Sequence, residues 1–159
     1  NSLRYFANPD VSSKKLVDIN ECIQQAKQLI YSQSSKSICI KNTLTEIPNV
    51  TGTPLLLTQA ISGILANAMD SKPKSGCVYV TTHHTNTHIV ITIKDDGLGM
   101  SPEKLKSISD PLSSPPSTKK GLGLRIALNI FHQHHGEMSI NSQEGQGTIV
   151  TIELPLTKV

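Results

Sequence analysis

The positions of apolar residues along the chain predict three amphipathic helices, because in each of them apolar residues recur every three or four positions. These predicted helices cover residues 18–32, 55–69 and 122–135. Asp18 can cap the first helix, and Glu21 three positions later completes a capping-box pattern. Pro54 is typical of a first helical residue and Gly136 of a position just after a helix end. The second helix is apolar on most of its faces and is therefore expected to be deeply packed.

Strands are predicted where apolar and polar residues alternate, or where β-branched residues dominate a short run. They cover residues 37–41, 77–82, 88–94, 138–140 and 148–154. Two connections, 85–87 and 144–147, are short enough to make hairpins of the strands that flank them. Ser101-Pro102-Glu103 has the sequence of a helix start, so a short helix is expected there. Residues 110–120 are rich in proline and serine, which predicts a mobile surface loop.

The order of these elements is helix, strand, helix, hairpin, loop, helix and hairpin. It favours an α+β fold, a two-layer α/β sandwich in which a mixed, mainly antiparallel sheet is covered on one face by three helices. A length of 159 residues suits one compact domain. We therefore assign residues 18–159 to this domain and residues 1–17 to the end of a preceding helix or linker.

Composition and charge narrow the possible functions. The net charge is +3, and the basic residues neither cluster nor alternate with aromatic ones, so we expect no nucleic-acid partner. No apolar run approaches the ~20 residues that span a bilayer, and no signal-peptide pattern is present. Cys22, Cys39 and Cys77 lack the spacing of metal ligands. We expect them to be three part-buried thiols in a reducing compartment.

Two segments carry polar residues that suit ligand binding. Asn67 lies late in the apolar second helix, where an amide is costly to bury without a partner. It is either a metal ligand through its amide oxygen or bonded to a neighbouring carbonyl. Asp95 directly follows a strand and can accept a hydrogen bond from an amino group such as adenine N6. Gly97 and Gly99 let the backbone approach a ligand, although Asp-Gly is also typical of an ordinary turn.

Two further segments are rich in glycine. Residues 121–124, Gly-Leu-Gly-Leu, open the third helix, where backbone amides form an anion site. Lys119 and Lys120 precede this segment and add positive charge where phosphates would lie. Taken alone, a Gly-x-Gly segment is weak evidence, and the alternative is a solvated loop. The last segment, 145–148, is by itself a hairpin turn that ends at Thr148.

In this order, the four segments resemble the motifs of the GHKL ATP-binding fold, and within it those of the sensor histidine kinases. The matching segments are residues 57–68 for the N box, 95–99 for the G1 box, 121–124 for the G2 box and 145–148 for the last glycine motif. His134 also matches a histidine that this family usually carries. The resemblance covers residues 15–155, which is nearly the whole chain.

The resemblance implies a Bergerat-type fold that binds ATP and Mg²⁺. Asn67 would be the catalytic residue that binds Mg²⁺, and Asp95 would recognise the adenine amino group. Gly97 and Gly99 would shape the base pocket, with Thr148 near the adenine. The other expected nucleotide contacts are made near the phosphates, by Lys119, Lys120, Gly121, Leu122, Gly123 and Leu124. Residues 110–120 would form a lid over the ATP.

The implied function is transfer of the γ-phosphoryl group of Mg²⁺-ATP to a histidine on a separate dimerisation domain, within a two-component sensor histidine kinase. Residues 1–17 are too short to contain that histidine and its helices. The expected partners are the dimerisation helices of the same protein and a response regulator. We expect the isolated domain to be a cytoplasmic monomer, within a parent protein that is either membrane-anchored or soluble.

Gly63 departs from the family pattern, one helical turn before Asn67. Sensor kinases commonly have a second Asn there, whereas the ATP-hydrolysing relatives and the anti-sigma-factor serine kinases have a Glu. Glycine either allows close packing or leaves room for water. The predicted lid departs as well, because Lys119 stands where a further glycine is common. These departures keep an alternative open, a degenerate kinase domain that acts as a nucleotide- or protein-binding module without phosphotransfer.

Overall fold

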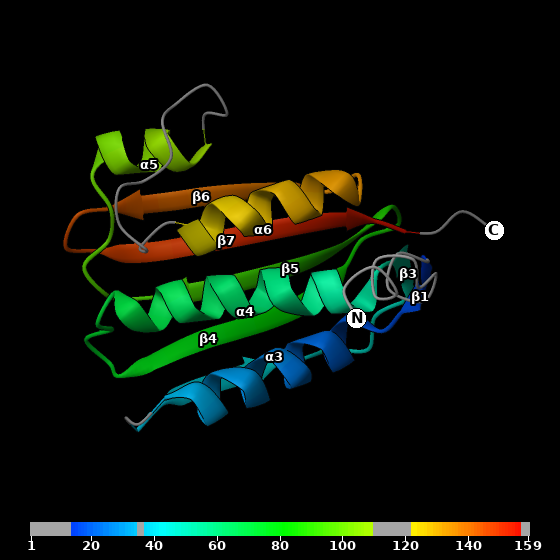
Figure 1. The fold of residues 1–159 in the computed structure, drawn as a ribbon, viewed down its shortest axis with the longest axis horizontal. Coiled ribbons are helices and arrows are strands. Elements are labelled where there is room, and N and C mark those ends of the chain that lie inside the picture. Colours follow the sequence, from blue (N-terminus) through cyan, green and yellow to red (C-terminus); the bar gives the residue numbers. More distant parts are fainter. Residues whose placement is uncertain (1–13, 35–36, 110–121, 157–159) are drawn as a thin grey trace, which may run out of the picture.

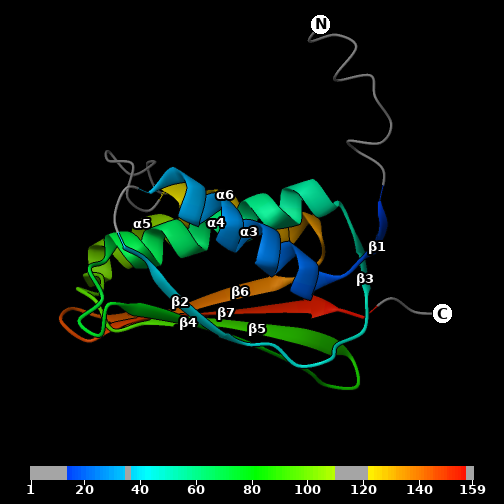
Figure 2. The ribbon, with the colours of Figure 1, turned by 90° about the horizontal axis from the view of Figure 1, so that it is seen from below.

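The computed structural model describes residues 14–34, 37–109 and 122–156, which form a helical layer packed on one face of a sheet (Figures 1 and 2). The helical layer contains α3 (Ile19–Gln33), α4 (Pro54–Asp70) and α6 (Leu122–Gln133), together with the short α5 (Pro102–Ser109). Helix α3 begins at the predicted cap, where the Asp18 carboxylate accepts a hydrogen bond from the Glu21 amide. The predicted α+β fold class is confirmed.

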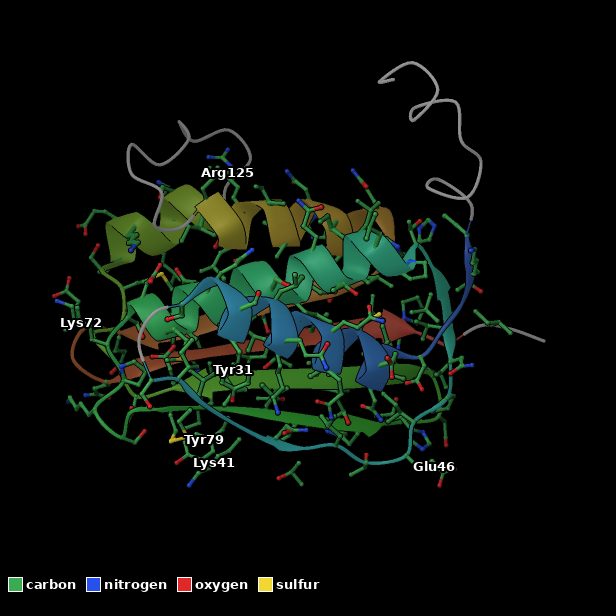
Figure 3. The ribbon with its side chains drawn as sticks, turned by 60° about the horizontal axis from the view of Figure 1, so that its bottom comes forward. Tyr31, Lys41, Glu46, Lys72, Tyr79 and Arg125 are labelled. Carbon is green, nitrogen blue, oxygen red and sulfur yellow. A yellow bond between two sulfur atoms is a disulfide. The ribbon has the colours of Figure 1, made fainter. Side chains whose placement is uncertain are left out.

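The main sheet has five strands in the order β2 (Cys39–Thr43), β4 (Cys77–His84), β5 (His88–Asp95), β7 (Gly147–Pro155) and β6 (Glu137–Gln143). Only the pairing of β2 with β4 is parallel. The face away from the helices is polar, and Tyr79 and Lys41 project from neighbouring strands on that side (Figure 3). The mainly antiparallel sheet agrees with the prediction.

Two strands were not predicted from the sequence. β1 (Lys15–Val17) pairs with β3 (Val50–Gly52) in a small antiparallel sheet of its own. Strands of three residues are too short for an alternating pattern to be recognised. Val17 is buried in the core, so residues 15–17 pack with the domain. The domain boundary that we expected at residue 17 stays a prediction.

The cysteines differ from the expectation of three thiols. Cys39 and Cys77 lie opposite each other in the β2–β4 pair, with their Cα atoms 4.5 Å apart, and they form a disulfide. Cys22 is a free, buried thiol, and burial raises its pKa. Sequence spacing could not predict the disulfide, because the two cysteines are 38 positions apart and are brought together only by parallel strand pairing.

No helix in the described part of the chain is long and apolar enough to cross a membrane.

His134 joins the end of α6 to the start of α4. Its Nε2 atom accepts a hydrogen bond of 3.0 Å from the Thr53 amide. Because that nitrogen accepts, the proton of the neutral ring lies on Nδ1, which is 2.8 Å from the Ile130 carbonyl oxygen and donates to it. Residue His134 is only 6% exposed, so both hydrogen bonds are protected from water.

The His134→Ala variant should therefore lose stability. Removing the ring leaves the Thr53 amide without its partner and opens a buried space, which should lower the free energy of unfolding by about 2–3 kcal/mol. His132→Ala is the control, because His132 is exposed and lies in the last turn of α6, just before His134. Urea unfolding of both variants checks the prediction, and equal stabilities would contradict it.

Candidate functional site

Asp95 ends β5 and is the most buried acidic residue of the site, with an exposed fraction of 4%. Its Oδ1 atom accepts one hydrogen bond of 2.9 Å from the Ser71 hydroxyl and another of 2.9 Å from the Gly97 amide. Burial raises the pKa of this carboxyl group, and the two hydrogen bonds oppose that rise. Both of these bonds end on Oδ1, and a hydrogen bond from the Thr148 backbone also lowers the pKa. A donor group of a ligand would use the acceptor capacity that remains on Oδ2.

The loop after Asp95 is held in place by backbone hydrogen bonds to two other segments. The Leu98 amide donates to the Ser71 carbonyl oxygen at 2.8 Å, and the Gly145 amide donates to the Leu98 carbonyl oxygen at 2.7 Å. A Cβ atom at Gly97 would lie 2.2 Å from the Ser71 hydroxyl oxygen. The glycines predicted to shape a pocket therefore stand where the backbone passes too close to its neighbours for a side chain.

A cleft lies beside Asp95, between α4 and α5. It is lined by Asn67, Asp70, Ser71, Leu98, Gly99, Met100, Lys104 and Thr148. Of the residues singled out from the sequence, Asn67, Gly99 and Thr148 thus face one space. Thr148 is also paired with Asp95 across strands β5 and β7.

Sequence reasoning missed several residues of this cleft. Ser71 holds Asp95 but belongs to a loop that carries no motif of its own. Asp70 and Lys104 are ordinary charged residues near helix ends, and only the folded chain brings them to the same cleft. Asp70 follows Asn67 by three positions on α4, a helical spacing that could have indicated a shared face.

The predicted phosphate-binding segment is described only in part. Lys119, Lys120, Gly121 and the predicted lid at 110–120 lie outside the described residues. Leu122, Gly123 and Leu124 form the first turn of α6. The Leu124 side chain is fully buried in the core, so any contact that this residue makes with a ligand must come from its backbone.

Gly63 allows α4 and α6 to pack closely. A Cβ atom at Gly63 would lie 3.0 Å from the carbonyl oxygen of Gly123, and a Cβ atom at Gly123 would lie 3.1 Å from that of Gly63. Each glycine therefore faces the backbone of the other. Of the two explanations that the sequence left open, the structure supports close packing over room for water.

The Gly63→Ala variant should lose about 1 kcal/mol of stability. Alanine favours a helix over glycine by about the same amount, but its Cβ must push the backbone of Gly123 aside in a tightly packed contact. Gly123→Ala should behave alike for the same reason. Chemical unfolding measures the stability of both variants. A gain in stability of about 1 kcal/mol, which helix propensity alone predicts, would contradict the account.

The chemistry of the cleft fits Mg²⁺ only when a phosphate ligand is also present. Among the described residues, no group of three or more His, Cys, Asp or Glu side chains could hold a metal ion. The cleft offers the amide oxygen of Asn67 and the carboxylate of Asp70. Such a small set of oxygen ligands is typical of Mg²⁺ sites that are completed by phosphate groups and water.

Comparison with known proteins places this site in context. A family model described as "Histidine kinase-, DNA gyrase B-, and HSP90-like ATPase" matches residues 52–158. Sporulation kinase C of Bacillus subtilis is 35% identical over 97% of the chain, which covers 37% of that protein. Sensor histidine kinase ZraS of Escherichia coli is 29% identical over 95% of the chain, which covers 33% of that protein. The chain thus spans about a third of the length of these relatives.

Solved structures share the fold. A mycobacterial sensor histidine kinase, MprB, matches with a TM-score of 0.72 and 27% identity, over 91% of this chain and 97% of that one. The catalytic domain of histidine kinase ThkA matches with a TM-score of 0.76 and 20% identity, over 92% of this chain and 99% of that one. The second likeness supports the fold alone.

Proposed function

The chain belongs to the family of histidine kinase-, DNA gyrase B- and HSP90-like ATPases, and on this premise we propose that it binds Mg²⁺-ATP as the catalytic domain of a sensor histidine kinase. The γ-phosphoryl group passes to a histidine on the dimerisation helices of the same protein, and a response regulator receives it next. The isolated domain acts as a monomer on the cytoplasmic side, whether or not its parent protein is membrane-anchored.

The environment of Asp95 is the observation that carries this proposal. A carboxylate that is 4% exposed and held at Oδ1 by two hydrogen bonds keeps acceptor capacity on Oδ2, which suits recognition of an amino group such as adenine N6. Thr148 and Gly99 line the space beside it. Because Asp95 is fixed by Ser71 and Gly97 before any ligand binds, little ordering is needed on binding.

The remaining roles follow from the family resemblance, together with the positions of those residues that the structure describes. Asn67 and its neighbour Asp70 hold the Mg²⁺ ion, which neutralises charge on the phosphates when it is bound. The backbone at Gly121 and Gly123 holds phosphate oxygens at the start of α6, with Leu122 and Leu124 contributing only through the backbone. Lys119 and Lys120 add positive charge, and residues 110–120 cover the nucleotide. Positioning of the γ-phosphate for in-line attack supplies most of the catalysis.

Phosphotransfer is tested with a longer protein that includes the preceding dimerisation helices. After incubation with γ-labelled ATP, we expect label that is stable to alkali and lost in acid, as a phosphorylated histidine requires. The same protein with Asp95→Asn serves as the negative control. A protein that binds ATP but takes no label would favour the second candidate, a module that binds nucleotide or protein without phosphotransfer, to which Gly63 also points.

Adenine nucleotide affinity should fall as the pH is lowered. The hydrogen bond to the adenine amino group is strongest when the acceptor is ionised, and burial raises the pKa of Asp95. Protonation therefore begins at a higher pH than for an ordinary aspartate, and affinity should already decline in mildly acidic solution. Titrations with ADP across a pH series measure this, with inosine diphosphate, which lacks the amino group, as the comparison. A flat ADP profile would contradict the assignment of Asp95.

A further inference from the structure

Lys104 is the only basic residue among the described residues that line the cleft beside Asp95. It comes from α5, whereas the amide and acidic side chains of the cleft, Asn67 and Asp70, come from α4 on the other side. Its side chain is half-buried, although lysines are mostly exposed in folded proteins. No motif of the sequence includes it, and the function proposed above does not use it.

The packing of α5 directs Lys104 toward the cleft. Ile108, one turn later on the same face of the helix, is 1% exposed and belongs to the core. Leu105 also packs against the core. The Lys104 amide donates to the Ser101 hydroxyl at 3.2 Å, which caps the start of the helix and fixes the position of Lys104. Lys106, by contrast, is exposed.

The charges of the cleft require a cation if a phosphate is to enter. Asp70 lines this space, and Asp95 is bonded to Ser71, which also lines it, so a nucleotide phosphate would bring further negative charge near both carboxylates. Lys104 is the one described cleft residue that can offset that repulsion. An ammonium group bonded to a phosphate oxygen makes a charge-assisted hydrogen bond, which is stronger than a neutral one.

We propose that Lys104 binds a phosphate group of the nucleotide, and that it makes the site prefer adenine nucleotides over adenosine. The inference rests on the proposed function, in which Asp95 holds the adenine. Asn67 lines the same cleft, so the phosphate bound by Lys104 is one that also lies near the proposed Mg²⁺ ligand. Lys104 and Asn67 thus approach the phosphates from opposite helices.

Calorimetric titration of the chain with adenosine, AMP and ADP tests this role. Lys104→Gln keeps the length and polarity of the side chain and removes its charge. We expect it to weaken AMP and ADP binding by roughly 10-fold or more, the effect of losing one charged hydrogen bond, and to change adenosine binding by less than about twofold. Lys106→Gln, which removes an exposed charge from the same helix, should leave all three affinities unchanged.

The outcomes separate this inference from the function on which it rests. Wild-type protein that binds ADP, with Lys104→Gln binding it equally well, overturns the inference and leaves the proposed function intact. If Lys104→Gln weakens adenosine and ADP binding equally, the inference is also overturned, because such a result indicates that Lys104 shapes the cleft. If the wild-type chain binds none of the three, both fail. Thermal unfolding of each variant confirms that the compared proteins are folded.

Discussion

Replacing Gly99 with alanine is expected to lower the free energy of unfolding by about 3 kcal/mol or more. The same variant is expected to lose nucleotide binding. Gly99 has a φ angle of +71°, a conformation that costs an alanine energy. Its Cβ atom would also lie 1.9 Å from the carbonyl oxygen of Gln143. Relieving that overlap means separating the loop after Asp95, which lines the cleft, from the end of β6.

Gly76→Ala is the matched control for this variant. Gly76 has a similar φ angle of +77°, but a Cβ atom there would meet nothing within 4 Å. The Gly76→Ala variant should therefore lose only the contribution of the backbone conformation, about 1 kcal/mol of the free energy of unfolding. Urea unfolding of the two variants separates backbone strain from overlap. Similar losses in both would show that the contact with Gln143 is not the cause.

The Asp95→Asn variant is expected to keep its fold and lose adenine nucleotide binding by roughly 10- to 100-fold. An asparagine Oδ1 still accepts from the Ser71 hydroxyl and the Gly97 amide, so the local structure is retained. At the position of Oδ2, however, a donor now faces the donor amino group of the base. Burial raises the pKa of Asp95, which means that the folded protein destabilises the charged carboxylate. A neutral amide at this position removes that destabilisation.

Asp96→Asn provides the control for that experiment. The Asp96 carboxylate accepts from the Ser75 amide at 3.1 Å, and the hydrogen bonds found for it lead to the loop at Ser75. This variant should bind ADP with nearly the wild-type affinity. The assignment of Asp95 would be wrong if both variants bound equally well, or if Asp95→Asn lost its binding only because it unfolded.

The helices and hairpins could be predicted because their signals are local. The Asp18 cap, the apolar face of α3 and the short turn at 85–87 each involve residues close together in the chain, and each is found in the structure. The candidate site could be predicted for a different reason. Asp95, at the end of β5, forms one short segment with Gly97 and Gly99, and this segment resembles a family motif. Close backbone approach leaves glycine as the residue that fits there.

The features that escaped prediction depend on contacts between distant segments. The role of Gly63 depends on Gly123, which lies against it only in the folded chain. The disulfide between Cys39 and Cys77 depends on a parallel strand pairing, and Ser71 reaches Asp95 across 24 positions. Lys104 enters the cleft because Ile108 anchors its helix in the core. Periodicity and short motifs carry no record of such contacts.

The central claim, that this chain binds adenine nucleotide with Mg²⁺, is tested most directly by calorimetric titration with ADP and with a non-hydrolysable ATP analogue, each with and without Mg²⁺. The account predicts binding in the micromolar to submillimolar range, strengthened by Mg²⁺ in wild-type protein and insensitive to it in Asn67→Ala. Absence of binding at millimolar nucleotide would contradict the claim, and equal wild-type affinity with and without Mg²⁺ would contradict the role of Asn67.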